Sequence, residues 1–209
     1  MDLMAMMTGF GLAAAAGGRA CLVLVVLGLF HYTPYFELSA RYGWVASPVV
    51  ICVAAVLAVV EILADTHPEL AEVVALASYL PKFAVGFIAL SATTGEVDVS
   101  LLQLAASGVV GGGTASAVHW VRSRVREAVH DASGDLHTLN SSYSWIESGG
   151  VLAMAGTAFL APLLAVIVIS LVLVGGFWAM RRIESAIDSA VEAKIQRAPP
   201  ADAPRGTGT

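Results

Sequence analysis

The chain has 209 residues, of which 57% are hydrophobic and 13% are charged. Because soluble domains are about 25% charged, this composition argues against a soluble protein and predicts an integral membrane protein. The formal net charge is -5 and no stretch forms a basic surface, which excludes a nucleic-acid partner.

Five segments are apolar enough to cross a bilayer, whose hydrocarbon core of about 30 Å takes roughly 20 helical residues. The third is weak, because Glu72, Pro81 and Lys82 interrupt it, and Pro81 favours a kinked span or a re-entrant segment. The sequence therefore predicts an all-α, polytopic helical bundle within a transmembrane domain of residues 1–182. The predicted spans are residues 8–30, 44–64, 70–92, 99–118 and 151–180.

Residues 119–148 form the one long polar stretch inside this domain. Valines recur there at four-residue spacing, which predicts that the fourth helix continues as an amphipathic arm and ends near Ser133. After the domain, apolar residues at helical spacing predict an amphipathic surface helix over residues 183–197. The composition of residues 198–209 is typical of a disordered tail.

Arginines outside the spans indicate which ends of the helices face the cytoplasm. The cluster at residues 122–126 and the pair Arg181 and Arg182 both favour the cytoplasmic side. A single fifth span would separate them, whereas a hairpin about Pro162 would give six crossings and keep them together. We favour five spans with a cytoplasmic N-terminus, because a hairpin of half-length helices would leave backbone groups exposed to lipid.

Arg19 interrupts the first apolar segment, and a guanidinium at that depth needs a partner or a nearby water boundary. Glu61 and Asp65 are four residues apart and share one face of the second helix. We expect Arg19 to neutralise Glu61, with Asp65 as a second acidic neighbour. In the alternative interpretation the span begins at Ala20 and Arg19 lies at the inner membrane boundary, where the same pairing is possible.

Two runs of small residues indicate either tight helix packing or broken helices. The spacing of Gly108 and Gly112 lets helix backbones touch, whereas discontinuous helices with exposed backbone groups occur in transporters. Setting Gly17-Gly18-Arg19-Ala20 beside Gly112-Gly113-Thr114-Ala115 suggests a weak internal repeat. The candidate packing or helix-break residues are Gly17, Gly18, Gly108, Gly112, Gly113 and Pro162.

His31 and His119 each end a predicted span, where a pair could hold haem or a metal ion. The sequence has no close cluster of His or Cys, so we expect interfacial or solvated histidines and neither metal nor cofactor. Cys21 and Cys52 are expected to be small apolar residues of the core rather than a disulfide. No spacing supports a catalytic arrangement, so we do not expect an enzyme.

Three blocks of the sequence resemble the bacterial membrane proteins grouped as domain of unknown function four-one-two-six. They are "GFGLAAAAGGRACLVLVVLGL", "VVEILADTHPEL" and "GVVGGGTASAVHWVRSRVREAVHDASG", the last followed by "LAPLLAVIV". The resemblance covers roughly Thr8 to Arg182 and implies a multi-pass inner-membrane protein without an established activity. It also implies that Glu61, Asp65 and His119 match positions of the family pattern. That pattern continues with acidic residues, a histidine and an arginine where this chain has Ala71, Ala75, Ser78 and Lys82.

Ionisable residues in or beside membrane spans are functional by default. We therefore expect a small-solute or ion transporter or channel of the bacterial inner membrane, with an intramembrane site that includes Arg19, Glu61, Asp65 and His119. The alternative is a non-catalytic structural subunit or assembly factor. The expected partners are the lipid bilayer and, through the Gly and Ala helix faces, a second copy or a membrane-complex subunit. A membrane enzyme that acts on lipid or quinone has no supporting motif.

Overall fold

The computed structural model describes residues 3–66, 77–94, 101–133 and 136–197. Every regular element within these ranges is a helix, which confirms the predicted all-α class. The elements are α1 (Leu3–Gly18), α2 (Ala20–Phe30), the 3-10 helix η1 (Ala40–Ala46), α3 (Pro48–Thr66), α5 (Tyr79–Thr93), α6 (Leu101–Ser107), the π-helical segment η2 (Gly108–Gly112), α7 (Gly113–Ser133), α8 (Leu136–Leu160) and α9 (Pro162–Arg197).

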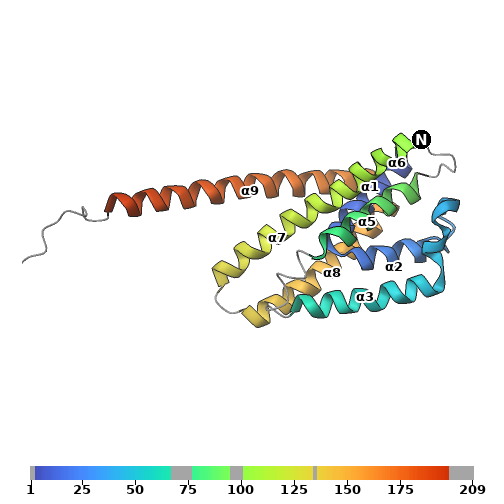
Figure 1. The fold of residues 1–209 in the computed structure, drawn as a ribbon, viewed down its shortest axis with the longest axis horizontal. Coiled ribbons are helices and arrows are strands. Elements are labelled where there is room, and N and C mark those ends of the chain that lie inside the picture. Colours follow the sequence, from blue (N-terminus) through green and yellow to red (C-terminus); the bar gives the residue numbers. More distant parts are fainter. Residues whose placement is uncertain (1–2, 67–76, 95–100, 134–135, 198–209) are drawn as a thin grey trace, which may run out of the picture.

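Helix α1 is the centre of the bundle. It packs against α5, α7, α8 and α9, while α2 packs against α3 and α5. The four alanines Ala13–Ala16 are buried, and such small side chains let neighbouring helices approach closely. Figure 1 shows α9 running along the bundle and projecting beyond it. We call the end from which it projects the α9 end, and the opposite end, where α1 begins, the N-terminal end.

The chain reverses direction at Arg19, so the prediction of one helix over residues 8–30 is wrong. Arg19 has an extended backbone (φ -137°, ψ 95°) between α1 and α2. A Cβ on Gly11 of α1 would overlap the residue of α8 that precedes Phe159. Phe30, the last residue of α2, stacks on the ring of Phe159, with ring centroids 4.0 Å apart. The start of α1 and the end of α2 therefore lie at the same end of the bundle. The two helices form the α1–α2 hairpin, whose tip is Arg19, and here the glycine run does break a helix.

The second glycine run does not break its helix, because α6 continues through η2 into α7. Gly86 of α5 and Gly111 of η2 face each other, and a Cβ on either residue would overlap the carbonyl oxygen of the other. Here the packing interpretation holds. The two runs that suggested an internal repeat therefore have different backbone conformations.

The glycines that were expected to bring helix backbones together, Gly108 and Gly112, instead lie against aromatic rings. Gly112 faces the ring of Phe83 and Gly108 faces that of a second phenylalanine, while Gly113 has no neighbouring atom within 4 Å of the position of a Cβ. The backbone contact is made by Gly111, because the π-helical turn changes which residues of the segment face α5.

The last apolar segment, residues 151–180, is two helices rather than one, because Pro162 begins a new helix after a reversal of the chain. Helices α8 and α9 lie side by side and run in opposite directions (Figure 1). The polar stretch 119–148 is divided between two helices: its first part belongs to α7, which ends at Ser133, and its second part belongs to α8. The predicted surface helix of residues 183–197 is the end of α9, not a separate element.

Other boundaries also differ from the predicted spans. Helix α3 begins at Pro48, after the predicted start of the second span. Helix α5 begins at Tyr79, so Pro81 lies in its first turn, where a proline needs no backbone donor and causes no kink. Residues 70–76 of the third predicted span and the tail predicted for 198–209 lie outside the described residues.

Among the described residues, one helix is long and apolar enough to cross a membrane, judged by its length and composition. Only 17% of this segment of α3, which runs from Pro48 to Asp65, consists of buried residues. Aliphatic side chains cover its outer side, as they do the outer side of α9. Those of α3 include Val49, Val53, Val56, Leu57, Val60 and Leu63, and those of α9 include Leu163, Ile167, Leu171 and Val174.

We predict that Gly111→Ala lowers the free energy of unfolding by about 1–3 kcal/mol, because the added methyl group overpacks the contact with Gly86. Gly113→Ala is the matched control, since its methyl group enters open space. It should raise the stability by roughly 0.5–1 kcal/mol through helix propensity. Thermal unfolding of the purified chain measures both. Equal effects of the two substitutions would contradict the close contact of α5 with η2.

Candidate functional site

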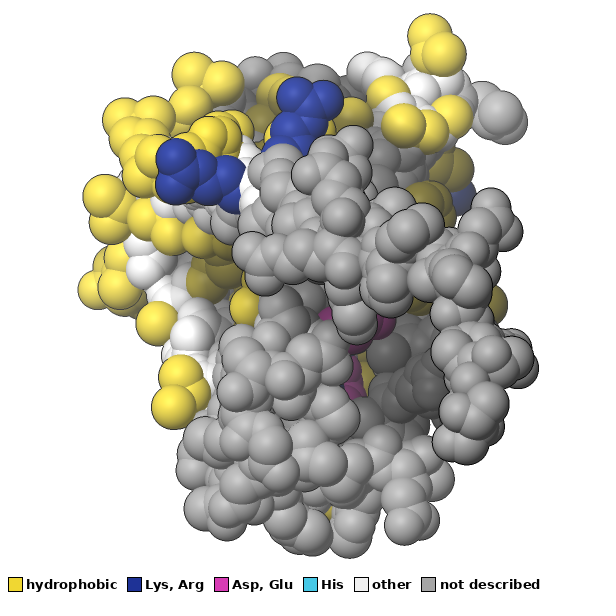
Figure 2. All heavy atoms as spheres, turned by 90° about the vertical axis from the view of Figure 1, so that its left-hand side faces the viewer, with side chains coloured by type: hydrophobic (Ala, Val, Ile, Leu, Met, Phe, Trp, Pro, Cys, Tyr) yellow, Lys and Arg dark blue, Asp and Glu magenta, His cyan; other side chains and the backbone are white. Residues whose placement is uncertain are grey.

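Charged side chains from the tip of the hairpin and from α3, α5, α7 and α8 meet inside the bundle. We call this set the ionic network. Figure 2, which views the molecule from the α9 end, shows acidic side chains set back behind the outermost atoms of this face. The basic members are Arg19, Lys82, Arg122 and Arg126, and the acidic members are Glu61, Asp65 and Glu147.

Arg19 is fully buried at the tip of the hairpin. Its Nη1 lies 2.9 Å from Oδ2 of Asp65, and its Nη2 lies 3.8 Å from Oε2 of Glu147. Nη2 also donates to the hydroxyl of Ser144 at 2.6 Å and to its carbonyl oxygen at 3.4 Å. A buried guanidinium needs such partners, and here α3 and α8 supply them.

Arg122 joins the same two carboxylates from α7. Its Nη2 lies 2.7 Å from both Asp65 Oδ2 and Glu147 Oε2, and its Nε donates to Glu147 Oε1. Burial acts to lower the pKa of Arg122, but the attraction of Glu147 and Asp65 outweighs it and raises the pKa above its ordinary value. Arg126 adds a third guanidinium, with Nη1 3.3 Å from Asp65 Oδ1. Three permanently charged side chains therefore surround Asp65.

Lys82 and His119 form a second part of the network, both of them buried. The Nζ of Lys82 lies 2.9 Å from Nδ1 of His119 and 3.9 Å from Oε1 of Glu61. An ammonium group can only donate, so Nδ1 accepts when Lys82 is charged. The ring of Tyr79 meets the His119 ring edge-on at 4.5 Å. Glu61 Oε2 is buried without a hydrogen-bond partner, as is Nε of Arg19 in the part around Asp65.

The structure changes the pairing expected from the sequence. Arg19 pairs with Asp65 rather than with Glu61, and the cation beside Glu61 is Lys82. The cause is that α5 packs against α2 and brings Lys82 to Glu61, while the hairpin tip lies beside Asp65, one turn farther along α3. A solvated His119, one of the expected alternatives, is excluded, because its side chain is fully buried between Lys82 and Tyr79.

Sequence reasoning missed several members of the network. Lys82 had been treated as an interruption of a span, and the arginines of α7 as signals of orientation only. One signal was available: on each of three helices the polar members are three or four residues apart, and therefore share a helix face. These sets are Glu61 and Asp65 on α3, His119, Arg122 and Arg126 on α7, and Ser144 and Glu147 on α8.

The balance of charge indicates what the network can do. Its four basic and three acidic side chains leave one positive charge in excess when all of them are ionised. The three guanidinium groups do not lose their protons, so exchange of a proton falls to Glu61, Lys82 and His119. The arrangement suits a proton relay or the attraction of an anion. In the part of the chain that the structure describes, no group of three or more His, Cys, Asp or Glu could hold a metal ion.

Comparison with known proteins adds a family but no characterised relative. The model of a domain of unknown function, DUF4126, matches residues 6–182, which confirms the resemblance seen in the sequence. No curated protein and no solved structure matches the chain.

We predict that Asp65→Asn lowers the free energy of unfolding by about 3–5 kcal/mol, because it removes the carboxylate that three buried or half-buried guanidiniums share. Glu127→Gln is the control, since it also replaces a carboxylate by an amide. Glu127 pairs with Arg124 at the surface, where both side chains are more than half exposed, and its loss should change the stability by less than about 1 kcal/mol. Chemical denaturation of the purified variants measures the difference. A small effect of Asp65→Asn would show that the network does not stabilise the fold.

Proposed function

We propose that this chain, which belongs to the DUF4126 family, spans a membrane as a helical bundle and moves a small solute or an ion through its ionic network. The observation that carries the proposal is a cluster of seven ionisable side chains at the tip of a helical hairpin, three of them buried and four half-buried. Ionisable groups are expensive in a membrane and mark ion or substrate pathways there.

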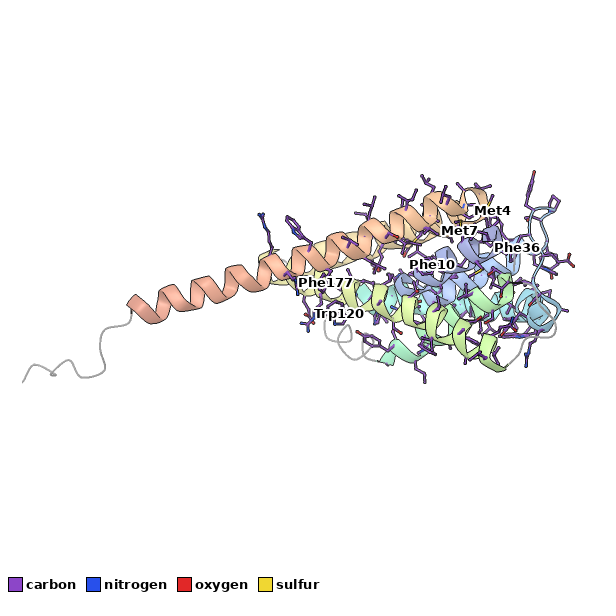
Figure 3. All side chains as sticks on the ribbon, turned by 90° about the horizontal axis from the view of Figure 1, so that it is seen from above. Met4, Met7, Phe10, Phe36, Trp120 and Phe177 are labelled. Atoms are coloured by element: carbon purple, nitrogen blue, oxygen red, sulfur yellow. The ribbon has the colours of Figure 1, made fainter. Side chains whose placement is uncertain are left out.

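Aromatic side chains support the membrane location, because they collect at the two levels where a bilayer would meet water. At the N-terminal end Tyr32, Tyr35 and Trp44 are more than half exposed. At the opposite level Trp120 and Phe177 lie where α9 leaves the bundle, while Phe36 lies at the N-terminal end (Figure 3). Helix α3 connects the two levels, and its stretch from Pro48 to Asp65 is about 26 Å long, close to the thickness of a hydrocarbon core.

The arrangement of the helices supports an orientation that differs from the sequence-based expectation. Because α8 and α9 form a hairpin, the arginines at 122–126 and the pair Arg181 and Arg182 lie at the same end. The preference of arginine for the cytoplasm then makes the α9 end cytoplasmic and places the start of α1 on the other side. We therefore propose that the chain lies in the bacterial inner membrane with its N-terminus outside the cytoplasm.

The α1–α2 hairpin is the element that would have to move during transport. It separates the ionic network from the N-terminal end, where buried alanines and leucines of α1 and α2 fill the interior. Re-entrant backbone of this kind is tolerated inside a membrane only where protein or a water-filled cavity surrounds it. Transport therefore requires a second conformation, in which the hairpin tip moves and exposes the network to that side.

The alternative function, a structural subunit or assembly factor, loses part of its support. Gly17, Gly18 and Gly112 face other helices of this same chain, so their small-residue faces are already occupied. The part of α9 that projects beyond the bundle offers a separate place for a partner protein (Figure 1). Transport is therefore our first proposal, and assembly through the projecting part of α9 our second.

The membrane location predicts that the full chain stays in the membrane fraction after extraction with sodium carbonate at alkaline pH. This treatment strips proteins bound through surface charges, whereas the exposed aliphatic side chains of α3 and α9 would remain in the hydrocarbon. The measurement is the share of the chain in the pellet, compared with a known peripheral protein. Release of most of the chain would contradict the proposed location.

For transport we predict that Glu61→Gln slows proton flux at least about tenfold in proteoliposomes that contain a pH-sensitive dye, because the amide cannot take up a proton beside Lys82. Glu127→Gln, which makes the same chemical change at the surface, should leave the flux unchanged. Correct folding of both variants is checked by their elution as single species. Equal fluxes in the wild type and Glu61→Gln would count against a transport role for the network.

A further inference from the structure

We propose that a cavity between α1, α7, α8 and α9 binds one acyl chain of an anionic phospholipid, whose headgroup Arg122 holds at the mouth. The inference rests on the proposed membrane location and does not depend on transport. The cavity has a volume of about 530 Å³, which is typical of ligand pockets. It opens to the side of the bundle, since the lining residues Val168 and Val172 are 42% and 48% exposed.

The shape of the cavity comes from small residues. The cavity exists because the residues on one side have little or no side chain, namely Ala14 and Gly18 of the hairpin and Gly150 and Ala153 of α8. Valines of α7 and α9 form the facing walls. A Cβ on Gly150 would have no neighbouring atom within 4 Å, so this glycine leaves space that no other helix fills. The resulting surface is apolar and suits a hydrocarbon chain.

Polarity within the cavity is confined to its ends. Arg122 and Glu147 lie at one end, and Thr157, whose hydroxyl donates to the carbonyl oxygen of Ala153 at 2.7 Å, lies at the other. Glu147 and Thr157 are ten residues apart, a distance of about 15 Å along α8. A long apolar cavity with charge at one end is complementary to an amphiphile.

The charged end lies at the level expected for a lipid headgroup. Trp120, two residues before Arg122, is exposed at the α9 end of the bundle, where Phe177 is also exposed (Figure 3). From that level the cavity follows α8 toward the middle of the proposed membrane. An acyl chain of a lipid in this leaflet takes the same direction.

The charge of the site selects an anionic headgroup. Arg122 and Glu147, the charged residues that line the cavity, belong to the ionic network, in which the four basic side chains outnumber the three acidic ones by one. Arg122 uses Nε and Nη2 for its pairs, and its Nη1 makes no hydrogen bond to a described residue. A phosphate group can accept from Nη1 and compensate the excess charge. Basic pockets between helices on the cytoplasmic side are a known way to bind anionic lipids.

The test measures lipids that stay bound when the full chain is extracted in mild detergent from vesicles. The vesicles contain equal amounts of phosphatidylglycerol and phosphatidylcholine with identical acyl chains, and native mass spectrometry counts each lipid per chain. We expect the wild type to retain phosphatidylglycerol about fivefold to tenfold over phosphatidylcholine. Gly150→Leu, which fills the cavity, should reduce this preference to less than about twofold.

The matched control is Gly149→Leu, the same change one residue earlier in α8. Gly149 also has open space around it but does not line the cavity, so the variant should keep the wild-type preference. Equal retention of the two lipids by the wild type, or an unchanged preference in Gly150→Leu, would overturn the proposal. Selective retention without proton flux would support the lipid site and count against proton transport through the network. Release of the chain by carbonate would remove the membrane location on which both depend.

Discussion

The contact of Arg19 with Asp65 is the constraint on which the rest of the structure depends. A fully buried guanidinium has to be compensated where it lies, and it lies at the point where the chain turns from α1 into α2. Its partners come from α3 and α8, so the pair joins helices that are distant in the sequence. Arg122 then connects the same carboxylates to α7. One buried charge thereby joins the hairpin tip, α3, α7 and α8, and small residues around it let these elements pack closely.

The two parts of the ionic network differ in chemistry, which bears on function. Around Asp65 the guanidiniums hold their protons and the carboxylates are closely paired, so this part is structural in character. Around Lys82 the distances to Glu61 are longer, and three groups that can exchange protons adjoin one another. A closely paired part beside a titratable part suits a proton-linked transporter, which is the function we propose.

The proposed lipid site adjoins the rigid part. Arg122 takes part in both, and Gly18 lines the cavity one residue before the hairpin tip. A lipid bound there would contact α1, α7, α8 and α9 together, so its occupancy would favour the conformation seen here over one in which the hairpin has moved. A membrane lipid would then stabilise the present position of the α1–α2 hairpin, the element that has to move during transport.

The sequence by itself determined the all-α class, the family and the presence of ionisable groups among apolar segments, because composition and local spacing suffice for these. It also located Arg19, Glu61 and Asp65, since charges stand out in apolar runs. It ranked Glu61 before Asp65 as the partner of Arg19, treated residues 8–30 as a single helix, and favoured a single helix over a hairpin at Pro162 for residues 151–180. The tertiary structure alone decided that both segments are hairpins and that Lys82, Arg122 and Glu147 complete the network. The reason is physical: which helices meet depends on the close fit of Gly and Ala faces and on the balance of buried charges, and both involve residues far apart in the chain.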